Sequence, residues 1–265
     1  MGRGKATHVV DRNIIVSHSA GRNQGALIRS VSDDYCIALI EQLWHGARMS
    51  VHEFSAMRAS MVSNQLRTNA VTNLSVIRAM ETVEREDFVP ADRQALAYVD
   101  VSVPLTVARS LNAPLTTARL LCESDPKPGD KILLIGAATG YAIALLVNMG
   151  VAVVAVEDDV VLEAALRQNF SGQAHVAIIS SPLSEGHSAG APYDAIIIDG
   201  AVEQVPQTLW DQLNEGGLIV AGLVDRGVTR LASGRKFAGS GVMKPFMDLN
   251  AAVLPGFAAA AGFRF

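Results

Sequence analysis

A glycine-rich turn and a later glutamate are the residues of this sequence best suited to binding chemistry. The turn runs from position 136 to 140, after an apolar run and before an Ala/Leu-rich helical pattern. Its backbone can pass close to a ligand, and free N–H groups at the start of the helix favour an anionic carboxylate. Glu157 ends the next predicted strand, where its carboxylate can accept hydrogen bonds from both hydroxyls of a ribose. Together they predict a site for a nucleoside-type cofactor, although Glu157 could also be a solvated acid beside Asp158 and Asp159.

Three glycine motifs compete for the turn. A phosphate-binding P-loop ends in Gly-Lys-Ser/Thr, whereas Tyr141 follows Gly140 here. The dinucleotide fingerprint G-x-G-x-x-G needs glycines at 136, 138 and 141, and only Gly136 fits, which disfavours a nicotinamide oxidoreductase. The pattern G-x-G-x-G fits at Gly136 and Gly140 with Ala138 between them. An alanine at the middle position is expected to need an ordinary, negative φ.

Residue patterns for other kinds of catalysis do not occur in the sequence. We find no Ser-His-Asp arrangement, no metal-ligand spacing and no close pair of carboxylates in a glycine-rich context, and His175 and His187 are isolated. Methyl transfer from a sulfonium group to an ionised nucleophile needs mainly alignment and a dry site. The sequence is therefore compatible with cofactor-borne chemistry and predicts no metal site.

The composition indicates a globular protein without a strong charge bias. The chain has 265 residues, of which 49% are hydrophobic and 18% charged, and a net charge of −4 gives no argument for nucleic acid. Cys36 and Cys122 lie far apart and predict no disulfide framework. No apolar stretch approaches the roughly 20 residues that span a bilayer, and the first residues lack the apolar core of a secretory signal. We expect a cytoplasmic protein that binds neither nucleic acid nor membrane. The sequence carries no signal for its oligomeric state.

Alternating strands and helices must position the turn and the glutamate. Periodicity predicts helices at 57–69, after Asn73 as N-cap, and from Pro114 onward. Further along, short β-branched strands alternate with helices, as is typical of a parallel sheet buried on both faces. We therefore predict an open, doubly wound α/β sheet with ligands at the carboxyl ends of its strands. The predicted strands are 131–135, 152–157, 175–179, 193–200 and 217–224, with helices at 141–149, 159–169 and 205–213 and further strands from about 228.

Residues 1–56 differ from the rest of the chain. They are polar and aperiodic, and only residues 34–44 could form a short amphipathic helix. We expect an N-terminal extension that is dispensable for the core and need not be ordered.

Several segments resemble the protein-L-isoaspartate (D-aspartate) O-methyltransferase family. Residues 61–90 and 97–105 are similar to its N-terminal helical region and the segment after it, 111–121 to its substrate-loop motif, 129–141 to its cofactor motif, and 191–220 to its fourth and fifth strands. The resemblance implies a class I methyltransferase fold over 57–265, with a helical and substrate-loop region at 57–125 and a cofactor-binding sheet at 126–265. It implies S-adenosyl-L-methionine as cofactor and methylation of the carboxylate of isoaspartyl residues in damaged proteins, as a repair step.

The resemblance also suggests cofactor-binding residues. Gly136, Gly140 and Glu157 match the family's cofactor positions, and Ala138 stands for the middle glycine. Ser181 falls in the loop where the family has Gly-Asp-Gly. The set also includes Asp199, where the family has a small polar residue.

Asn112 is the expected contact of the catalytic site, because it takes the place of the family's substrate-loop serine. The alternative is an asparagine that only caps the following helix. The tripeptide 108–110, Ala-Arg-Ser, replaces the family's Gly-Gln-Thr, and Leu134 replaces an acid at the end of the first strand. These changes leave two alternatives to the repair enzyme, which are a methyltransferase with a shifted substrate and a non-catalytic descendant that binds a cofactor or a partner.

Overall fold

The computed structural model describes residues 7–11, 14–17 and 49–258. Contacts divide the chain into two units, Met1–Arg48 and Met49–Phe265. In the first unit, strands β1 (Thr7–Asp11) and β2 (Ile14–Ser17) pair in antiparallel fashion. The helix expected at 34–44 lies outside the described residues.

Helix α2 (Val51–Met61) lies at the start of the second unit and runs across the boundary expected after residue 56. Ser50 begins it with a capping box, in which the Ser50 hydroxyl accepts from the Glu53 N–H at 3.3 Å and the Glu53 carboxylate accepts from the Ser50 N–H at 2.6 Å. Phe54 on this helix is buried in the core of the second unit. The first turn of α2 thus belongs to the folded domain.

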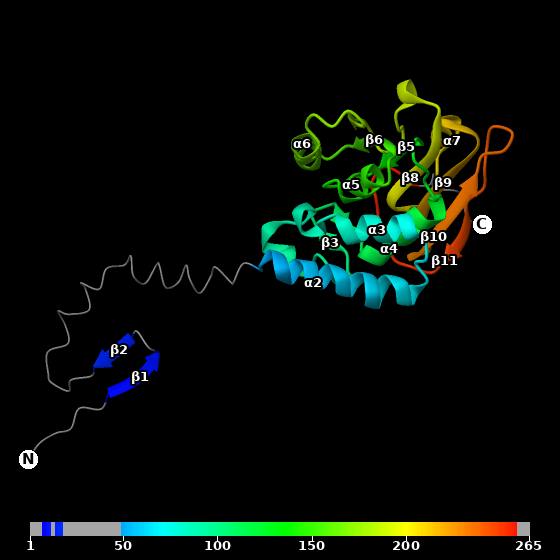
Figure 1. The fold of residues 1–265 in the computed structure, drawn as a ribbon. Helices are drawn as coiled ribbons and strands as arrows, with labels where there is room; N and C mark the ends of the chain where they lie inside the picture. Colours follow the sequence, from blue (N-terminus) through cyan, green and yellow to red (C-terminus); the bar gives the residue numbers. More distant parts are fainter. Residues whose placement is uncertain (1–6, 12–13, 18–48, 259–265) are drawn as a thin grey trace, which may run out of the picture. The chain divides into compact units, whose positions relative to one another are not determined.

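The second unit is built on a seven-stranded sheet with strand order β11-β10-β9-β8-β5-β6-β7. Strands β5 to β9 pair in parallel, while β10 and β11 are added antiparallel at one edge. This arrangement confirms the predicted doubly wound, mostly parallel sheet (Figure 1). The strands are β5 (Lys131–Ile135), β6 (Ala152–Glu157), β7 (Val176–Ser180), β8 (Tyr193–Val202), β9 (Leu213–Asp225), β10 (Val228–Arg235) and β11 (Lys244–Met247).

Two helices begin where the sequence signals predict, whereas the helix expected at 57–69 begins earlier, at Val51. The Asn73 side chain accepts from the Ser75 and Val76 N–H groups at 2.9 and 3.3 Å, and Pro114 is the first residue of α4. A short hairpin, β3 (Val103–Pro104) and β4 (Ser110–Leu111), precedes α4. The helices are α3 (Leu74–Thr82), α4 (Pro114–Ser124), α5 (Tyr141–Asn148), α6 (Val160–Asn169) and α7 (Gln207–Asp211), with single turns η1 (Val62–Leu66), η2 (Arg67–Asn69), η3 (Arg85–Phe88), η4 (Ala91–Leu96) and η5 (Ser188–Gly190).

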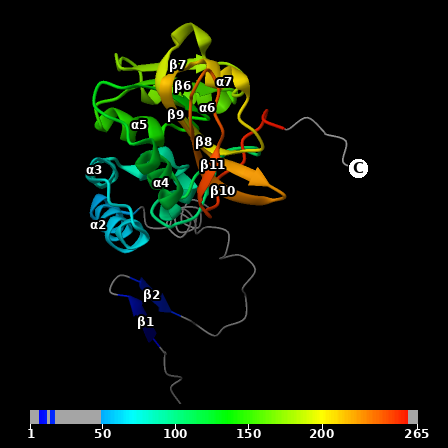
Figure 2. The ribbon, with the colours of Figure 1, turned by 90° about the vertical axis from the view of Figure 1, so that its right-hand side faces the viewer.

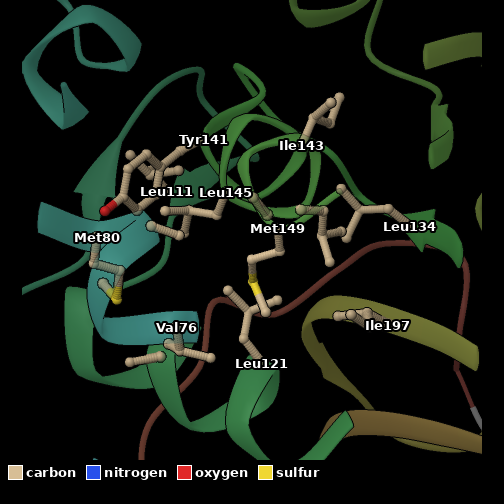
Figure 3. Packing of buried hydrophobic residues seen from close by; sticks show 14 of the residues in the cluster. Val76, Met80, Leu111, Leu121, Leu134, Tyr141, Ile143, Leu145, Met149 and Ile197 are labelled. Atoms are coloured by element: carbon tan, nitrogen blue, oxygen red, sulfur yellow. The ribbon is translucent and has the colours of Figure 1, made fainter. Parts of the chain in front are cut away.

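The central strand β5 is apolar on both faces and separates two cores. Ile132 and Leu134 point into a cluster with residues of α3, α4 and α5, part of which Figure 3 shows, whereas Leu133 and Ile135 point into a second cluster that includes α7. Figure 2 shows α5 and α7 on opposite sides of the sheet. Within the described ranges, no helix has both the length and the apolar character needed to cross a bilayer.

Candidate functional site

The crossovers of the sheet reverse between β5 and β8, so a ligand crevice is expected at the carboxyl ends of these two strands. Gly136 and Gly200 form the floor there, and the Leu254 side chain lies against both. A Cβ added at Gly136 would lie 2.8 Å from Leu254 Cδ1, and one at Gly200 would lie 2.5 Å from Leu254 Cγ. Leu254 is only 4% exposed, so a side chain of the protein itself fills the crevice.

The glycine turn has the tight geometry that the sequence predicts. Gly136 and Gly140 have φ values of +75° and +102°, and a Cβ at Gly140 would lie 2.3 Å from Phe170 Cε2. Ala138 also takes a left-handed φ of +53°, so the expectation of an ordinary φ is wrong. Alanine is strained there, because its Cβ crowds the backbone in this region.

The backbone N–H groups of the turn are largely used within the protein. Those of Gly136 and Ala137 donate to the Val156 carbonyl, and that of Gly140 donates to the Ala137 carbonyl at 2.9 Å. The Ala138 N–H donates to Glu157 Oε2 at 2.8 Å. In this conformation these four groups are engaged within the protein, whereas the expectation of free N–H groups concerns the first turn of α5, which begins at Tyr141.

Glu157 is fully buried, which contradicts the alternative of a solvated acid. Both of its oxygens accept from the Arg109 guanidinium, Oε1 from one terminal nitrogen and Oε2 from the other at 3.0 Å. The backbone N–H groups of Asp158 and Asp159 also donate to Oε1, at 3.1 and 3.2 Å. With the Ala138 N–H added, the carboxylate has no acceptor position left for a ribose. The guanidinium takes the place predicted for the two hydroxyls.

Asn112 and Asp199 lie side by side and are both buried. Asn112 Nδ2 donates to Asp199 Oδ1 at 2.7 Å, and Asn112 Oδ1 accepts from the Ala252 N–H at 2.7 Å. Burial raises the pKa of Asp199, against the opposing effects of the Asn112 hydrogen bond and of nearby Arg85 and Arg109. The N-cap of α4 is Ala113 and makes no side-chain capping bond, so the helix-capping alternative for Asn112 is wrong.

Two openings are lined by residues of the predicted site. One, of about 440 Å³, is lined by Asn112, Thr116 and Asp100 together with residues 249–252. The other, of about 330 Å³, is lined by Ser181, its neighbours in the loop after β7, and Asp158. The structure thus brings Asn112 together with Asp199, and Gly136 and Ala138 together with Glu157, while Ser181 lines a separate opening.

Two buried arginines are functional candidates that the sequence reasoning did not select. Arg109 is described above. Arg85 is fully buried, donates to the carbonyls of Ala97 and Asn112 at 2.6 Å each, and lies with its guanidinium 4.7 Å from the ring centroid of Tyr141. Burial lowers the pKa of Arg85 and raises that of Tyr141 to about 12. The departure at Ala-Arg-Ser was visible in the sequence, but nothing near it indicated that the arginine is buried.

In the part of the chain that the structure describes, no three His, Cys, Asp or Glu side chains lie together in a way that could hold a metal ion.

Comparisons with known proteins identify the family and agree with the fold. A family model described as Protein-L-isoaspartate(D-aspartate) O-methyltransferase (PCMT) matches residues 57–250. The protein-L-isoaspartate O-methyltransferase of Koribacter versatilis is 35% identical over 169 residues, which cover 63% of this chain and 76% of the relative. That of Methylorubrum populi is 33% identical over 168 residues, which cover 62% and 78%.

Solved structures of the same family share the fold. One protein-L-isoaspartate O-methyltransferase superimposes with a TM-score of 0.66 at 20% identity and covers 75% of this chain and 66% of that one. A putative family member from Plasmodium falciparum, in complex with S-adenosyl-L-homocysteine, gives a TM-score of 0.63 at 17% identity and covers 75% and 96%. The chain therefore belongs to the protein-L-isoaspartate (D-aspartate) O-methyltransferase family of S-adenosyl-L-methionine-dependent protein carboxyl methyltransferases.

Proposed function

We propose that this chain methylates the carboxylate of isoaspartyl residues in damaged proteins, with S-adenosyl-L-methionine as methyl donor. The observation that carries the proposal is the family match over residues 57–250, which includes the glycine turn and Glu157 at the carboxyl ends of β5 and β6. When bound, the cofactor supplies an electrophilic methyl group. The part of the protein is to bind both reactants, to align them and to exclude water.

In the proposal, the cofactor-binding residues are Gly136, Ala138, Gly140, Glu157, Asp199 and Ser181. Asn112 contacts the substrate, because it lines the opening of about 440 Å³ next to the crevice. The region up to residue 125 then serves the substrate, and the sheet from 126 serves the cofactor. The two well-separated cysteines suit a reducing cytoplasm as the place of action.

S-adenosyl-L-methionine does not fit the crevice in this conformation. Arg109 holds both oxygens of Glu157, and Leu254 fills the space in front of Gly136 and Gly200. Binding of the cofactor requires both side chains to move.

The same contacts favour a second candidate function, a non-catalytic member of the family. In this case the Arg109–Glu157 and Asn112–Asp199 pairs are permanent parts of the core. Such a protein keeps the fold and does not turn over the cofactor.

Transfer of a labelled methyl group separates the two candidates. The full-length protein is incubated with labelled S-adenosyl-L-methionine and a peptide that contains one isoaspartyl residue, with the same peptide containing aspartate as control. The proposed function predicts label in the isoaspartyl peptide only, in a base-labile form as expected of a methyl ester. Absence of label at enzyme concentrations equal to that of the peptide contradicts the repair function and leaves the non-catalytic candidate.

A further inference from the structure

Residues 249–257, which we call the covering segment, cross the carboxyl edge of the sheet after β11. Backbone bonds join the segment to β8, from the Ala201 N–H to the Ala252 carbonyl at 2.7 Å and from the Leu254 N–H to the Ala201 carbonyl at 2.9 Å. On the other side, the Asn250 carbonyl accepts from the Thr116 hydroxyl at 2.7 Å. The Asn112 side chain holds the Ala252 N–H. The covering segment is therefore fixed to both the sheet and the substrate-loop helix.

The covering segment places apolar side chains where the fold leaves room for a ligand. Leu254 and Phe257 are 4% and 3% exposed and belong to the core cluster that contains Ile135 and Ile198, whereas Val253, which precedes Leu254, is 60% exposed. Leu254 thus points inward between two exposed neighbours, Val253 and Pro255. Leu254 reaches the floor glycines of β5 and β8, at the point where the crossovers reverse.

Arg109 closes the neighbouring part of the same crevice. It lies at the end of the loop of the β3–β4 hairpin, and one of its terminal nitrogens lies 3.2 Å from a Cβ added at Gly136. The hairpin also reaches the end of β6 through Thr106, whose hydroxyl donates to Asp159 at 3.0 Å. A cation thus neutralises Glu157, and an apolar side chain covers the glycines beside it.

The chain departs from its family resemblance at the residues that hold this arrangement. The resemblance implies Gly-Gln-Thr at the tripeptide that contains Arg109 and a serine at the position of Asn112. Asn112 bonds both the covering segment and Asp199, itself a departure. The family match ends at residue 250, so Leu254 and Phe257 lie beyond it. These separate changes in the sequence meet in one structural arrangement.

We propose that Arg109 and the covering segment are an intramolecular occupant of the cofactor crevice, so that cofactor binds only to molecules in which both have moved away. The affinity measured for a ligand is then the intrinsic affinity reduced by the fraction of open molecules. The inference rests on the proposed function only for the identity of the ligand.

The test is calorimetric titration of the full-length protein with S-adenosyl-L-homocysteine. Leu254→Ala removes the side chain from the floor glycines, and Arg109→Gln releases the Glu157 carboxylate. Each variant is expected to bind roughly tenfold or more tightly than wild type, because it raises the fraction of open molecules. Matched controls are Leu146→Ala, a buried leucine in the last turn of α5, and Arg167→Gln in an exposed pair on α6; both should bind like wild type.

Hydrogen exchange gives a second measurement that does not depend on the variants. In wild-type protein, saturation with S-adenosyl-L-homocysteine should lower the protection of the Ala252 and Leu254 amides, whose acceptors are Asn112 and Ala201. The protection of amides within β5 should be unchanged or higher. Unchanged protection at Ala252 and Leu254 in the saturated protein contradicts the proposal.

The titration separates this proposal from the proposed function. Equal affinity in wild type, Leu254→Ala and Arg109→Gln overturns the proposal that Arg109 and the covering segment occupy the crevice, even if isoaspartyl peptides are methylated. Absence of binding in every folded variant also overturns it, because something else then excludes the ligand. If the two variants bind the ligand more tightly but no protein transfers methyl to the isoaspartyl peptide, the intramolecular occupant is supported and the repair function is contradicted.

Discussion

The buried ion pair between Arg109 and Glu157 allows a quantitative test of the site's construction. The perturbations are Arg109→Met, which replaces the cation by an apolar chain, Glu157→Gln, which removes the negative charge but keeps an acceptor oxygen, and the double variant. The two side chains are 2% and 0% exposed, so each single change leaves an opposite charge, or its hydrogen-bonding partners, buried without compensation.

The expected magnitudes follow from this burial. Breaking a buried pair by removing one partner costs about 3–5 kcal/mol, so each single variant should lose that much free energy of unfolding. The double variant has no uncompensated charge and should cost about as much as one single variant. The interaction energy of the cycle then equals the cost of one single variant, about 3–5 kcal/mol, at or above the upper end for residues in contact.

Urea unfolding monitored by circular dichroism measures all four proteins, and an unchanged m-value confirms that the states compared are the same. The control is Arg167→Met, which breaks the i,i+4 pair with Glu163, where the side chains are 55% and 18% exposed. It should cost only about 0.3–0.5 kcal/mol. If Arg109→Met costs less than about 1 kcal/mol, the guanidinium is not held in the crevice and the reasoning fails.

Four further predictions concern other parts of the molecule. Because burial raises the pKa of Asp199, the folded state binds its proton more tightly than the unfolded state, and wild-type stability should fall as pH rises from about 4 through the raised pKa. The melting temperature of Asp199→Asn, measured against pH, should lack this fall. Identical pH profiles of wild type and variant contradict a raised pKa at Asp199. Asn112→Ala should lose about 1–3 kcal/mol of stability by leaving Asp199 and the Ala252 N–H unpaired, whereas an increase in isoaspartyl methyl transfer by Asn112→Ser over wild type would support a substrate contact at this position. A protein that begins at Met57 should melt below one that begins at Met49, since it lacks the Ser50 cap and the buried Phe54, and equal melting temperatures would place α2's first turn outside the fold. Asn73→Ala should cost about 0.5–2 kcal/mol in urea unfolding, as expected for loss of an N-cap, and no change would mean that its two capping bonds contribute nothing.

Periodicity and end signals in the sequence predict most of the fold. The β-branched runs at β5 and β6 are strands because both of their faces are buried, and Asn73 and Pro114 mark helix starts through local chemistry. Each of these signals acts over a few residues, and so it can be recognised without the rest of the chain. The boundary of the domain was harder to predict, because α2 has almost no apolar face and only Phe54 and Met61 on it are buried.

The contents of the site depend on contacts between residues far apart in the sequence. Arg109 and Glu157 are separated by 48 positions, and Asn112 and Asp199 by 87. No local pattern indicates that an arginine in a polar stretch will be buried against one particular glutamate. The left-handed backbone of Ala138 is similarly imposed by its surroundings, since the residue itself prefers the opposite sign of φ. The sequence therefore predicted the floor of the crevice but not its occupant.

The covering segment follows every strand of the sheet in the chain, which has a consequence for the order of events during synthesis. A chain made from its N-terminus can assemble the crevice between β5 and β8 before residues 249–257 have been added. A ligand present at that moment meets glycines that Leu254 does not yet cover, and only Arg109 opposes it. A ligand that arrives later competes with a segment of the same chain. Because the segment is tethered beside the crevice, its effective concentration there is high. What fills the crevice during synthesis thus depends on whether the cofactor arrives before or after residues 249–257, until the two occupants reach equilibrium.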